Sequence, residues 1–435
     1  MPALPFTVEL ARDLIRLDTT NPPGEEHLAV ELVGRLLTDA HIDYARYESE
    51  PGRPNLVARV KGRGEAPPLL LQGHVDVVTT VNQDWRHRPF GGEIIDGYLW
   101  GRGALDMKGG VAMLVNAALR ANARGGAPGD LILAVLADEE AGGVFGAKWI
   151  VDTHPELFAG VRHGIGEGGG EAQYLEGRRF YPIMVSEKRG CQMVVTLRGP
   201  GGHGSIPSRG RAMAKLGDVI TKLDGNRLPV HITAPVQLQL ESMRDALDEP
   251  LKSAMAELLD PARSDAALER VGRLGAELDA VLHNTVNATI VSGGLKINVI
   301  PSAVQLHLDG RLLPGFGPDD MVRELRTVIG DEPEIEVLLV GPAQPPIDLT
   351  QFELFASILR EGDPGSVPIP FLQPGATDGR HFSKLGIVTY GFLPLNTPED
   401  FNGSPTVHAA DERVPVSSLE FGAECVYDAV MRYRG

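Results

Sequence analysis

A histidine and an aspartate lie two residues apart at the end of an apolar run. The run is LLLQGHVDVV, residues 69–78, and the pair is His74 and Asp76. Side chains alternate across a strand, so residues i and i+2 point to the same side. The pair can occupy the surface tip of a strand, or it can be an imidazole metal ligand with the carboxylate that orients it. This fragment alone does not decide between the two interpretations.

Other metal-capable side chains also follow apolar runs. Glu139 and Glu140 follow LILAVLA, Asp106 precedes VAMLVNAALRA, and Glu167 lies in the glycine-rich GIGEGGG. Taken singly, such carboxylates are more often solvated loop residues or helix caps than ligands. The carboxyl ends of parallel strands form the ligand crevice of α/β sheets, so these residues can converge there. A metal would give that convergence a physical reason, because clustered carboxylates repel one another and their pKa values rise.

The residue types in this set favour a catalytic metal centre. Histidine, aspartate and glutamate suit Zn²⁺, with Co²⁺ or Mn²⁺ as substitutes, and the lack of thiolates argues against a closed structural site. Two metal ions that share one carboxylate would satisfy a set of five ligands. Competing motifs are absent from the sequence, since GRGALDMKGG lacks the spacing of a phosphate loop and HGSIP is not a nucleophile elbow.

The elements that must position these residues alternate between helix and strand. Helical spacing in TVELARDLIRL and HLAVELVGRLLTDA precedes the apolar runs NLVARV, LLLQGHVDVV and LILAVLADEE. This pattern predicts an α/β fold with a mostly parallel sheet covered by helices. Residues 1–187 and 346–435 are expected to form this catalytic domain, which is discontinuous in the chain.

Residues 188–345 have a different pattern. Strand-like CQMVVTLRG, NATIVSGG, AVQLHLDGRLL and EIEVLLV and helical AMAKLGDVITKL and DDMVRELRTVIG follow the order β-α-β-β-α-β. That order predicts a ferredoxin-like α+β domain. An additional helical stretch near residues 231–284 interrupts it. The smaller domain is therefore expected to be inserted into the larger one.

The bulk composition narrows the classes of partner. Acidic residues outnumber basic ones by 58 to 41, and the formal net charge is −17. Such a charge disfavours nucleic acid and anionic membranes as partners. The N-terminal segment lacks a basic region followed by an apolar one, and no run approaches the roughly 18 apolar residues of a membrane span. The sequence therefore predicts a soluble, cytoplasmic protein.

Several sequence blocks together resemble the signature of one enzyme family. GHVDVV, WGRGALDMKGGVA, DEEAGG, GEGG and HAADE have the order and spacing found in a family of dizinc metallopeptidases. This family includes aminoacylase, succinyl-diaminopimelate desuccinylase and bacterial glutamate carboxypeptidase. The resemblance covers nearly the whole chain, since RLDTTNPPGEE, GPGGHGSIP, INVIPSAVQLHLDGRLLP and GATDGRHF also match.

The resemblance implies a role for each residue of the cluster. The five metal ligands would be Asp106 as the bridge, His74 and Glu167 at one Zn²⁺, and Glu140 and His408 at the other. Asp76 would orient the His74 ring, and Glu139 would be the general base. The sequence by itself does not distinguish Glu139 from Glu140, so that division comes from the resemblance. The resemblance also implies a cis peptide bond after Asp106.

Further roles fall in the smaller domain and near its boundary. His203, in GPGGHGSIP, would stabilise the oxyanion, reaching the site across the interface of a homodimer formed through this domain. The weaker matches are the substrate-binding candidates Asn298, Arg311, Gly375 and Thr377. An arginine suits a two-pronged grip on a carboxylate.

These expectations describe a dizinc hydrolase that cleaves the amide bond of N-acyl amino acids or short peptides, as aminoacylases and carboxypeptidases do. A water molecule held at the metals would be activated by Glu139. A dipeptidase or aminopeptidase on the same scaffold is an alternative. An alternative of another class is a homologue that binds a metal or ligand without catalysis, against which the intact ligand set and Glu139 argue. The preferred acyl group and amino acid stay open.

Overall fold

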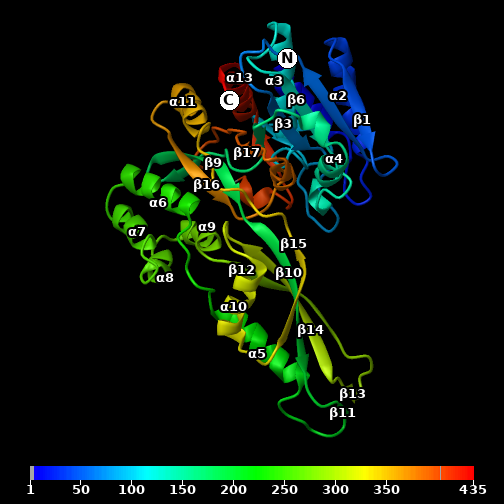
Figure 1. Ribbon diagram of the computed structural model, residues 1–435, viewed down its shortest axis with the longest axis vertical. Coiled ribbons are helices and arrows are strands. Elements are labelled where there is room, and N and C mark those ends of the chain that lie inside the picture. The colour runs from blue at the N-terminus through cyan, green and yellow to red at the C-terminus, as the bar shows by residue number, and fades with distance from the viewer. Residues whose placement is uncertain (1–3, 402) are drawn as a thin grey trace. The chain divides into compact units, whose positions relative to one another are not determined.

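The computed structural model describes residues 4–401 and 403–435. The chain divides into two compact units, whose elements are labelled in Figure 1. The units consist of these segments: Met1–Val185, Ile347–Phe371 and Thr377–Gly435 in unit 1, and Ser186–Pro346 and Leu372–Ala376 in unit 2. None of the helices in the described ranges is long and apolar enough to span a membrane.

Unit 1 is built around a nine-stranded sheet with the order β1-β2-β6-β3-β7-β17-β9-β16, in which β8 pairs with β9. Its strands are β1 (Tyr44–Glu48), β2 (Pro54–Val60), β3 (Leu69–His74), β6 (Leu131–Leu136), β7 (His163–Gly166), β8 (Gln173–Leu175), β9 (Arg178–Glu187), β16 (Val367–Gln373) and β17 (Val388–Gly391). The four central strands β6, β3, β7 and β17 are parallel, and antiparallel strands join them on both sides. The α/β class expected from the sequence is confirmed, with a parallel centre.

Helices cover both faces of this sheet, as the ribbon in Figure 1 shows. They are α1 (Phe6–Ile15), α2 (Glu26–Asp39), α3 (Lys108–Ala123), α4 (Ala147–Thr153), α11 (Phe352–Gly362), α12 (Gly379–Phe382) and α13 (Val416–Arg432). Leu69 and Leu71 of β3 pack into the core shared with α1, α2, α3, α11 and α13, whereas Leu70 packs into the core shared with α4 and α12. The continuous apolar run in β3 therefore reflects burial on both faces.

Unit 1 also contains several short elements outside this sheet. A three-stranded sheet has the order β18-β5-β4. Its strands are β4 (Glu93–Ile95), β5 (Tyr98–Trp100) and β18 (Arg413–Pro415). The 3₁₀ turns of unit 1 are η1 (Glu139–Ala141), η2 (Pro155–Phe158), η3 (Ser383–Leu385) and η4 (Ser404–Thr406).

Unit 2 contains a four-stranded antiparallel sheet with the order β12-β14-β10-β15. Its elements follow the chain as β10 (Arg189–Arg198), α5 (Ala212–Gly225), β12 (Thr285–Gly293), β14 (Ala303–Leu312), α10 (Pro318–Ile329) and β15 (Glu334–Val340). This is the β-α-β-β-α-β order expected from the sequence, and both helices share one core with the sheet.

The remaining elements of unit 2 lie outside this sandwich. Four helices separate α5 from β12, and two short strands form a ladder of their own. They are α6 (Ala234–Ala246), α7 (Leu251–Leu258), α8 (Ser264–Leu268), α9 (Arg273–Leu282), β11 (Gly202–His203) and β13 (Val299–Ile300).

Candidate metal centre

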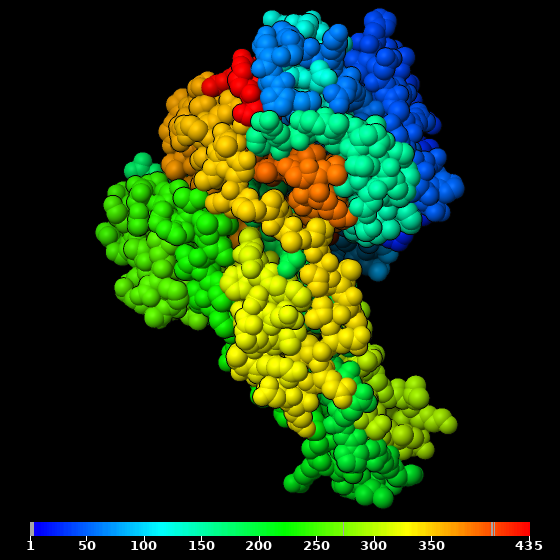
Figure 2. All heavy atoms as spheres, in the orientation of Figure 1, coloured from blue at the N-terminus to red at the C-terminus, as the bar shows by residue number. Residues whose placement is uncertain are grey.

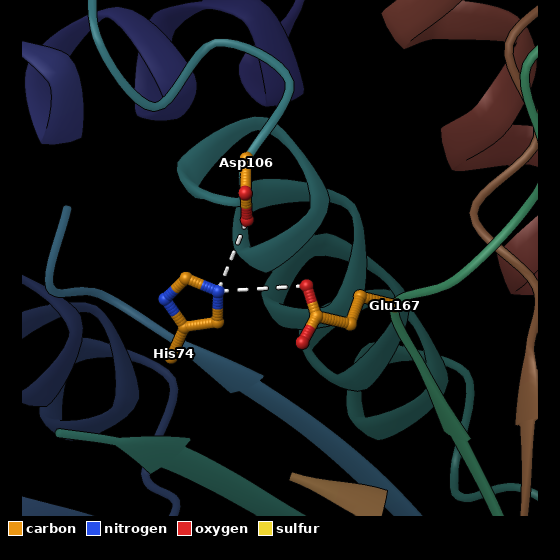
Figure 3. A group of neighbouring side chains, drawn as sticks. All are labelled: His74, Asp106 and Glu167. Atoms are coloured by element: carbon orange, nitrogen blue, oxygen red, sulfur yellow. Dashed lines mark hydrogen bonds and ion pairs between the residues drawn. The ribbon is translucent and has the colours of Figure 1, made fainter. Parts of the chain in front are cut away.

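His74 ends strand β3 with its ring buried among carboxylates. Its Nε2 atom lies 3.1 Å from Oδ1 of Asp106 and 3.5 Å from Oε2 of Glu167. Figure 3 shows the imidazole facing both carboxylates, with Asp106 coming from the loop before α3 and Glu167 from the end of β7. On the other side of the ring, Nδ1 lies 3.0 Å from the backbone carbonyl of Asp76 and 3.5 Å from its carboxylate. Asp76 therefore holds the ring in this orientation.

A second group shares Asp106 with the first. Nε2 of His408 lies 3.1 Å from Oδ2 of Asp106 and 3.2 Å from Oε2 of Glu140. Asp106 thus presents one oxygen to each histidine. In each group of three, the potential ligand atoms lie within 4.8 Å of one another. The structure brings together all five side chains that the sequence suggests as metal ligands.

The parallel sheet explains why these residues meet. Strands β6, β3 and β7 are parallel neighbours, so their carboxyl ends lie at one edge. Strand β3 ends at His74, and Glu167 directly follows β7. The η1 turn, which contains both glutamates, follows β6 after two residues. This is the edge at which open α/β sheets bind ligands.

A buried ion pair fixes the loops that carry Asp106 and His408. The carboxylate of Glu412 is fully buried and accepts hydrogen bonds from the backbone N–H groups of Gly103, Leu105 and Asp106. It also pairs with Arg102, which donates to the carbonyl of Ala409, 3.0 Å away. These contacts join the loop before α3 to the segment that follows His408. The peptide bond between Asp106 and Met107 is cis, as the resemblance implies.

The adjacent glutamates have different surroundings. Oε2 of Glu140 faces His408, whereas Oε1 of Glu139 accepts a hydrogen bond from Arg380, 3.1 Å away. Burial raises the pKa of Glu139 well above its usual value, and the charge of Glu167 adds to this rise. A buried carboxyl with a raised pKa has the basicity that a proton acceptor needs near neutral pH.

The neighbouring carboxylates raise the pKa values of both histidines. Burial lowers the pKa of His74, but the charge of Glu167 and hydrogen bonds to carboxylates outweigh it and raise the pKa well above the usual value. Hydrogen bonds to Asp106 and Glu140 raise the pKa of His408 to about 10. Burial raises the pKa of Asp106, but the two histidines lower it more. The carboxylates of the cluster therefore favour positive charge beside them.

The donor set fits divalent metal ions. Oε1 of Glu140 is buried and has no hydrogen-bond partner among the described residues. Four carboxylates, those of Asp106, Glu139, Glu140 and Glu167, lie in one cluster with two histidines. Oxygen and imidazole ligands in this ratio suit Zn²⁺ and its catalytic substitutes.

The other residues suggested by the sequence occupy different places. Thr377 is buried in unit 1, where its hydroxyl accepts a hydrogen bond from the N–H of Gly379 at the start of α12. Gly375, His203, Asn298 and Arg311 belong to unit 2. There, the N–H of Gly204 donates to the carbonyl of Asn298, which places Asn298 beside His203.

Two of these unit 2 side chains already have close partners. Arg311 makes a two-pronged contact with Asp309, with both N–O distances at 3.0 Å. Nδ1 of the exposed His203 lies 2.7 Å from the hydroxyl of Ser205 and accepts from the Ser205 N–H. A neutral His203 with Nδ1 as acceptor carries its proton on Nε2.

The sequence did not identify several residues of the site, because their roles depend on contacts between distant segments. These are Asn21, Arg53, Arg102, Asp138, Asp378, Arg380 and Glu412. The matching blocks contain all of these residues except Arg53: RLDTTNPPGEE contains Asn21, WGRGALDMKGGVA contains Arg102, DEEAGG contains Asp138, GATDGRHF contains Asp378 and Arg380, and HAADE contains Glu412. The sequence therefore held a signal for these six, whereas Arg53 is a single polar residue outside the blocks and had none.

Comparisons with known proteins agree with this geometry. The family model described as Peptidase family M20/M25/M40 matches residues 70–432. A succinyl-diaminopimelate desuccinylase from Cereibacter sphaeroides is 28% identical, with 98% of each chain covered. An N-fatty-acyl-amino acid synthase/hydrolase PM20D1 from Xenopus tropicalis is 26% identical over 81% of this chain and 70% of the relative.

The fold also matches solved structures. An M20 family metallo-carboxypeptidase, Sso-CP2 from Sulfolobus solfataricus, superimposes with a TM-score of 0.72 and 16% sequence identity. The match covers 98% of this chain and 99% of that chain. At this identity, the likeness establishes the fold.

Metal binding to the metal-free protein at pH 7 should release protons. The raised pKa values of His74 and His408 favour their protonated forms, but a histidine must be neutral to bind a metal. We expect His408→Gln to reduce the number of protons released by about one. Calorimetric titration with Zn²⁺ in buffers of different ionisation enthalpy measures this number.

The same titration of His163→Gln is the control. His163 is buried, contacts Tyr433 and lies outside the cluster. Its proton release should equal that of the wild type. An equal release from His408→Gln and the wild type would show that His408 does not give up a proton to a metal.

Proposed function

The chain belongs to peptidase family M20/M25/M40 and is a metal-dependent amide-bond hydrolase, and we propose that it uses two Zn²⁺ ions to cleave N-acyl amino acids or short peptides. The observation that carries the proposal is the bridging position of Asp106. One of its oxygens faces His74 and the other faces His408, each within 3.1 Å. A carboxylate shared by two ligand groups suits a pair of metal ions better than one ion.

The names of the relatives support the substrate class. One is a desuccinylase, and another is named for N-fatty-acyl amino acids. Both names describe an acyl group joined to an amino nitrogen, which is the bond proposed here. A dipeptidase or aminopeptidase activity would use the same metal ligands, so substrate tests must separate the two. The cytoplasmic location remains a prediction from the sequence.

We assign the metal ligands to the two groups that share Asp106. His74 and Glu167 would complete one site, and Glu140 and His408 would complete the other. Bound Zn²⁺ ions would supply Lewis-acid activation of water and of the amide carbonyl.

Glu139 is the proposed general base. Its carboxylate accepts a proton from the water molecule as the water oxygen attacks the carbonyl carbon of the amide. It then delivers this proton to the leaving nitrogen as the C–N bond breaks, which yields a carboxylate and an amine. Arg380 holds Oε1 of Glu139, so Oε2 is the atom that exchanges the proton.

His203 is the proposed donor to the oxyanion. Its Nδ1 atom is engaged by Ser205, which leaves Nε2–H exposed as a hydrogen-bond donor. Such a donor stabilises the charge that develops on the carbonyl oxygen. We propose that unit 2 acts as the lid and dimerisation domain, and that Asn298, Arg311, Gly375 and Thr377 contact the substrate.

Unit 2 offers a surface for a second copy of the chain. Among the described strands, β12 pairs only with β14, and its residues from Asn287 to Gly293 are exposed. The segment around residues 285–300, coloured yellow-green, lies at the surface in Figure 2. Exposed apolar side chains here are Ile290, Val291, Leu295, Ile297 and Val299. A long apolar edge strand favours pairing with the same strand of a second subunit.

Substrate tests address the function directly. The purified protein should release free amino acid from a panel of N-acyl amino acids faster than from dipeptides. A chelator should abolish this activity, and Zn²⁺ or Co²⁺ should restore it, because both ions suit the ligand set. Faster cleavage of dipeptides would favour the alternative substrate class, and activity that persists in the chelator would refute the metal mechanism.

The two glutamates should respond differently to substitution. Glu139→Ala is expected to keep its metal content and to lose about 10²- to 10⁴-fold in kcat, the usual contribution of a general base. Glu140→Ala should instead lose metal from one site, because its carboxylate faces His408. Metal analysis and steady-state kinetics of both folded variants test this division, which equal metal loss in the two variants would contradict.

Mixing two inactive variants tests the role of His203 across subunits. If His203 acts on the neighbouring subunit, a heterodimer of His203→Ala and Glu139→Ala has one intact site. Activity should then recover to about a quarter of the wild-type value after random exchange of subunits. No recovery despite exchange would place His203 in its own chain's site or outside catalysis.

A substitution on β12 tests the proposed dimer surface. Ile290→Lys should produce monomers in light scattering, whereas Leu338→Lys on β15 is the matched control.

A further inference from the structure

Asn21 bridges two buried carboxylates beside the metal cluster. Its side-chain nitrogen lies 2.8 Å from Oδ2 of Asp76 and 3.0 Å from Oδ1 of Asp138. An amide nitrogen has two hydrogens, so it can donate one to each carboxylate. Asp76 and Asp138 are at most 1% exposed, and Asn21 is 8% exposed. Two buried carboxylates this close to one donor atom would repel each other without it.

Both carboxylates hold the turn that carries the two glutamates. Asp76 accepts hydrogen bonds from the backbone N–H groups of Glu139 and Glu140, each at 3.1 Å. Asp138 accepts one from the N–H of Phe145 at 3.0 Å. The bridge made by Asn21 therefore joins the start of this turn to its end.

The network continues from Asp138 to Arg53. Arg53 contacts Oδ1 of Asp138 at 3.0 Å and also forms an ion pair with the fully buried Glu26. The guanidinium of Arg53 lies 5.2 Å from the ring centre of Phe145. The network thus contains three carboxylates and one cation. An amide at position 21 supplies donors without adding a fourth negative charge.

The backbone of Asn21 is itself fixed to the metal-binding strand. Its N–H donates to the carbonyl of Val77 at 2.9 Å, and Thr20 and Val77 form a parallel bridge. Val77 lies three residues after His74 in the chain. Asn21 therefore links the segment that follows β3 to the turn that follows β6.

We propose that Asn21 is a positioning residue that sets the place of Glu139 and Glu140 relative to His74. This inference rests on the proposed function, because the roles of base and metal ligand are what the positioning serves. Asn21 acts through Asp76 and Asp138 and belongs to neither ligand group. Groups that orient metal ligands contribute about 10- to 100-fold to metal affinity or activity.

Two substitutions of Asn21 test the inference. Asn21→Ala removes the donors, and Asn21→Asp replaces them with a fourth carboxylate of nearly the same shape. In the metal-free protein, the N–H groups of Glu139 and Glu140 should exchange with solvent at least about tenfold faster, because Asp76 loses its support. Hydrogen exchange followed by mass spectrometry measures this without any activity.

Metal binding and kinetics give the second readout. Both variants should bind Zn²⁺ about 10- to 100-fold more weakly in titrations of the metal-free protein. With saturating Zn²⁺, kcat should fall while KM changes by less than about threefold, because the substrate contacts are intact. The effect of Asn21→Asp should exceed that of Asn21→Ala.

Asn284→Asp is the matched control for a general loss of stability. Asn284 is buried in unit 2 and donates to Glu324 at 2.9 Å, so the substitution also places two carboxylates together. It should lower the melting temperature but leave Zn²⁺ affinity and the exchange of the Glu139 and Glu140 amides unchanged.

Two outcomes would overturn the inference. One is unchanged exchange of the Glu139 and Glu140 amides in both Asn21 variants. The other is faster exchange with wild-type Zn²⁺ affinity and kcat, which would make the bridge purely structural. Failure of the proposed function would be seen separately, in a wild-type protein that binds no Zn²⁺ and cleaves no member of the substrate panel.

Discussion

Repulsion among closely spaced carboxylates is the constraint on which the rest of unit 1 depends. The buried Asp76 and four half-buried carboxylates converge at the carboxyl edge of the parallel sheet, where water screens them only in part. Burial raises the pKa values of Glu139 and Glu167, and it raises the pKa of nearby Asp378 to about 7. Such a cluster is stable only where cations and N–H groups surround it. The loops around the cluster provide these cations and N–H groups.

Backbone N–H groups and a buried ion pair provide this compensation. Glu412 and Asp76 each accept hydrogen bonds from backbone N–H groups, three for Glu412 and two for Asp76. The loops that carry the ligands are thereby fixed, yet both oxygens of Asp106 stay directed at the histidines. The buried ion pair between Arg102 and Glu412 compensates charge away from the ligand positions. Supporting groups of this kind set the orientation and basicity of metal ligands.

The two units contain different parts of the proposed chemistry. Unit 1 contains both ligand groups and Glu139, so the proposed metal binding and proton transfer would take place at one edge of its sheet. Unit 2 contains His203, whose contact with Ser205 leaves the outer ring nitrogen as a donor. In the proposed function, this donor would stabilise the charge that develops on the carbonyl oxygen.

The set of five ligands came from the family resemblance, which alone separated Glu140 from Glu139. The sequence by itself determined the α/β class, the order of the main elements and the presence of metal-capable side chains at strand ends. It could do so because apolar periodicity reports burial, and because His74 and Glu167 sit at or just after strand ends that parallel pairing brings to one edge. Only the tertiary structure revealed the supporting network of Asn21, Arg53 and Asp138, and the contact of Arg380 with Glu139. These contacts join segments up to 241 residues apart. Single polar residues carry no periodic signal, so their partners are decided by packing in three dimensions.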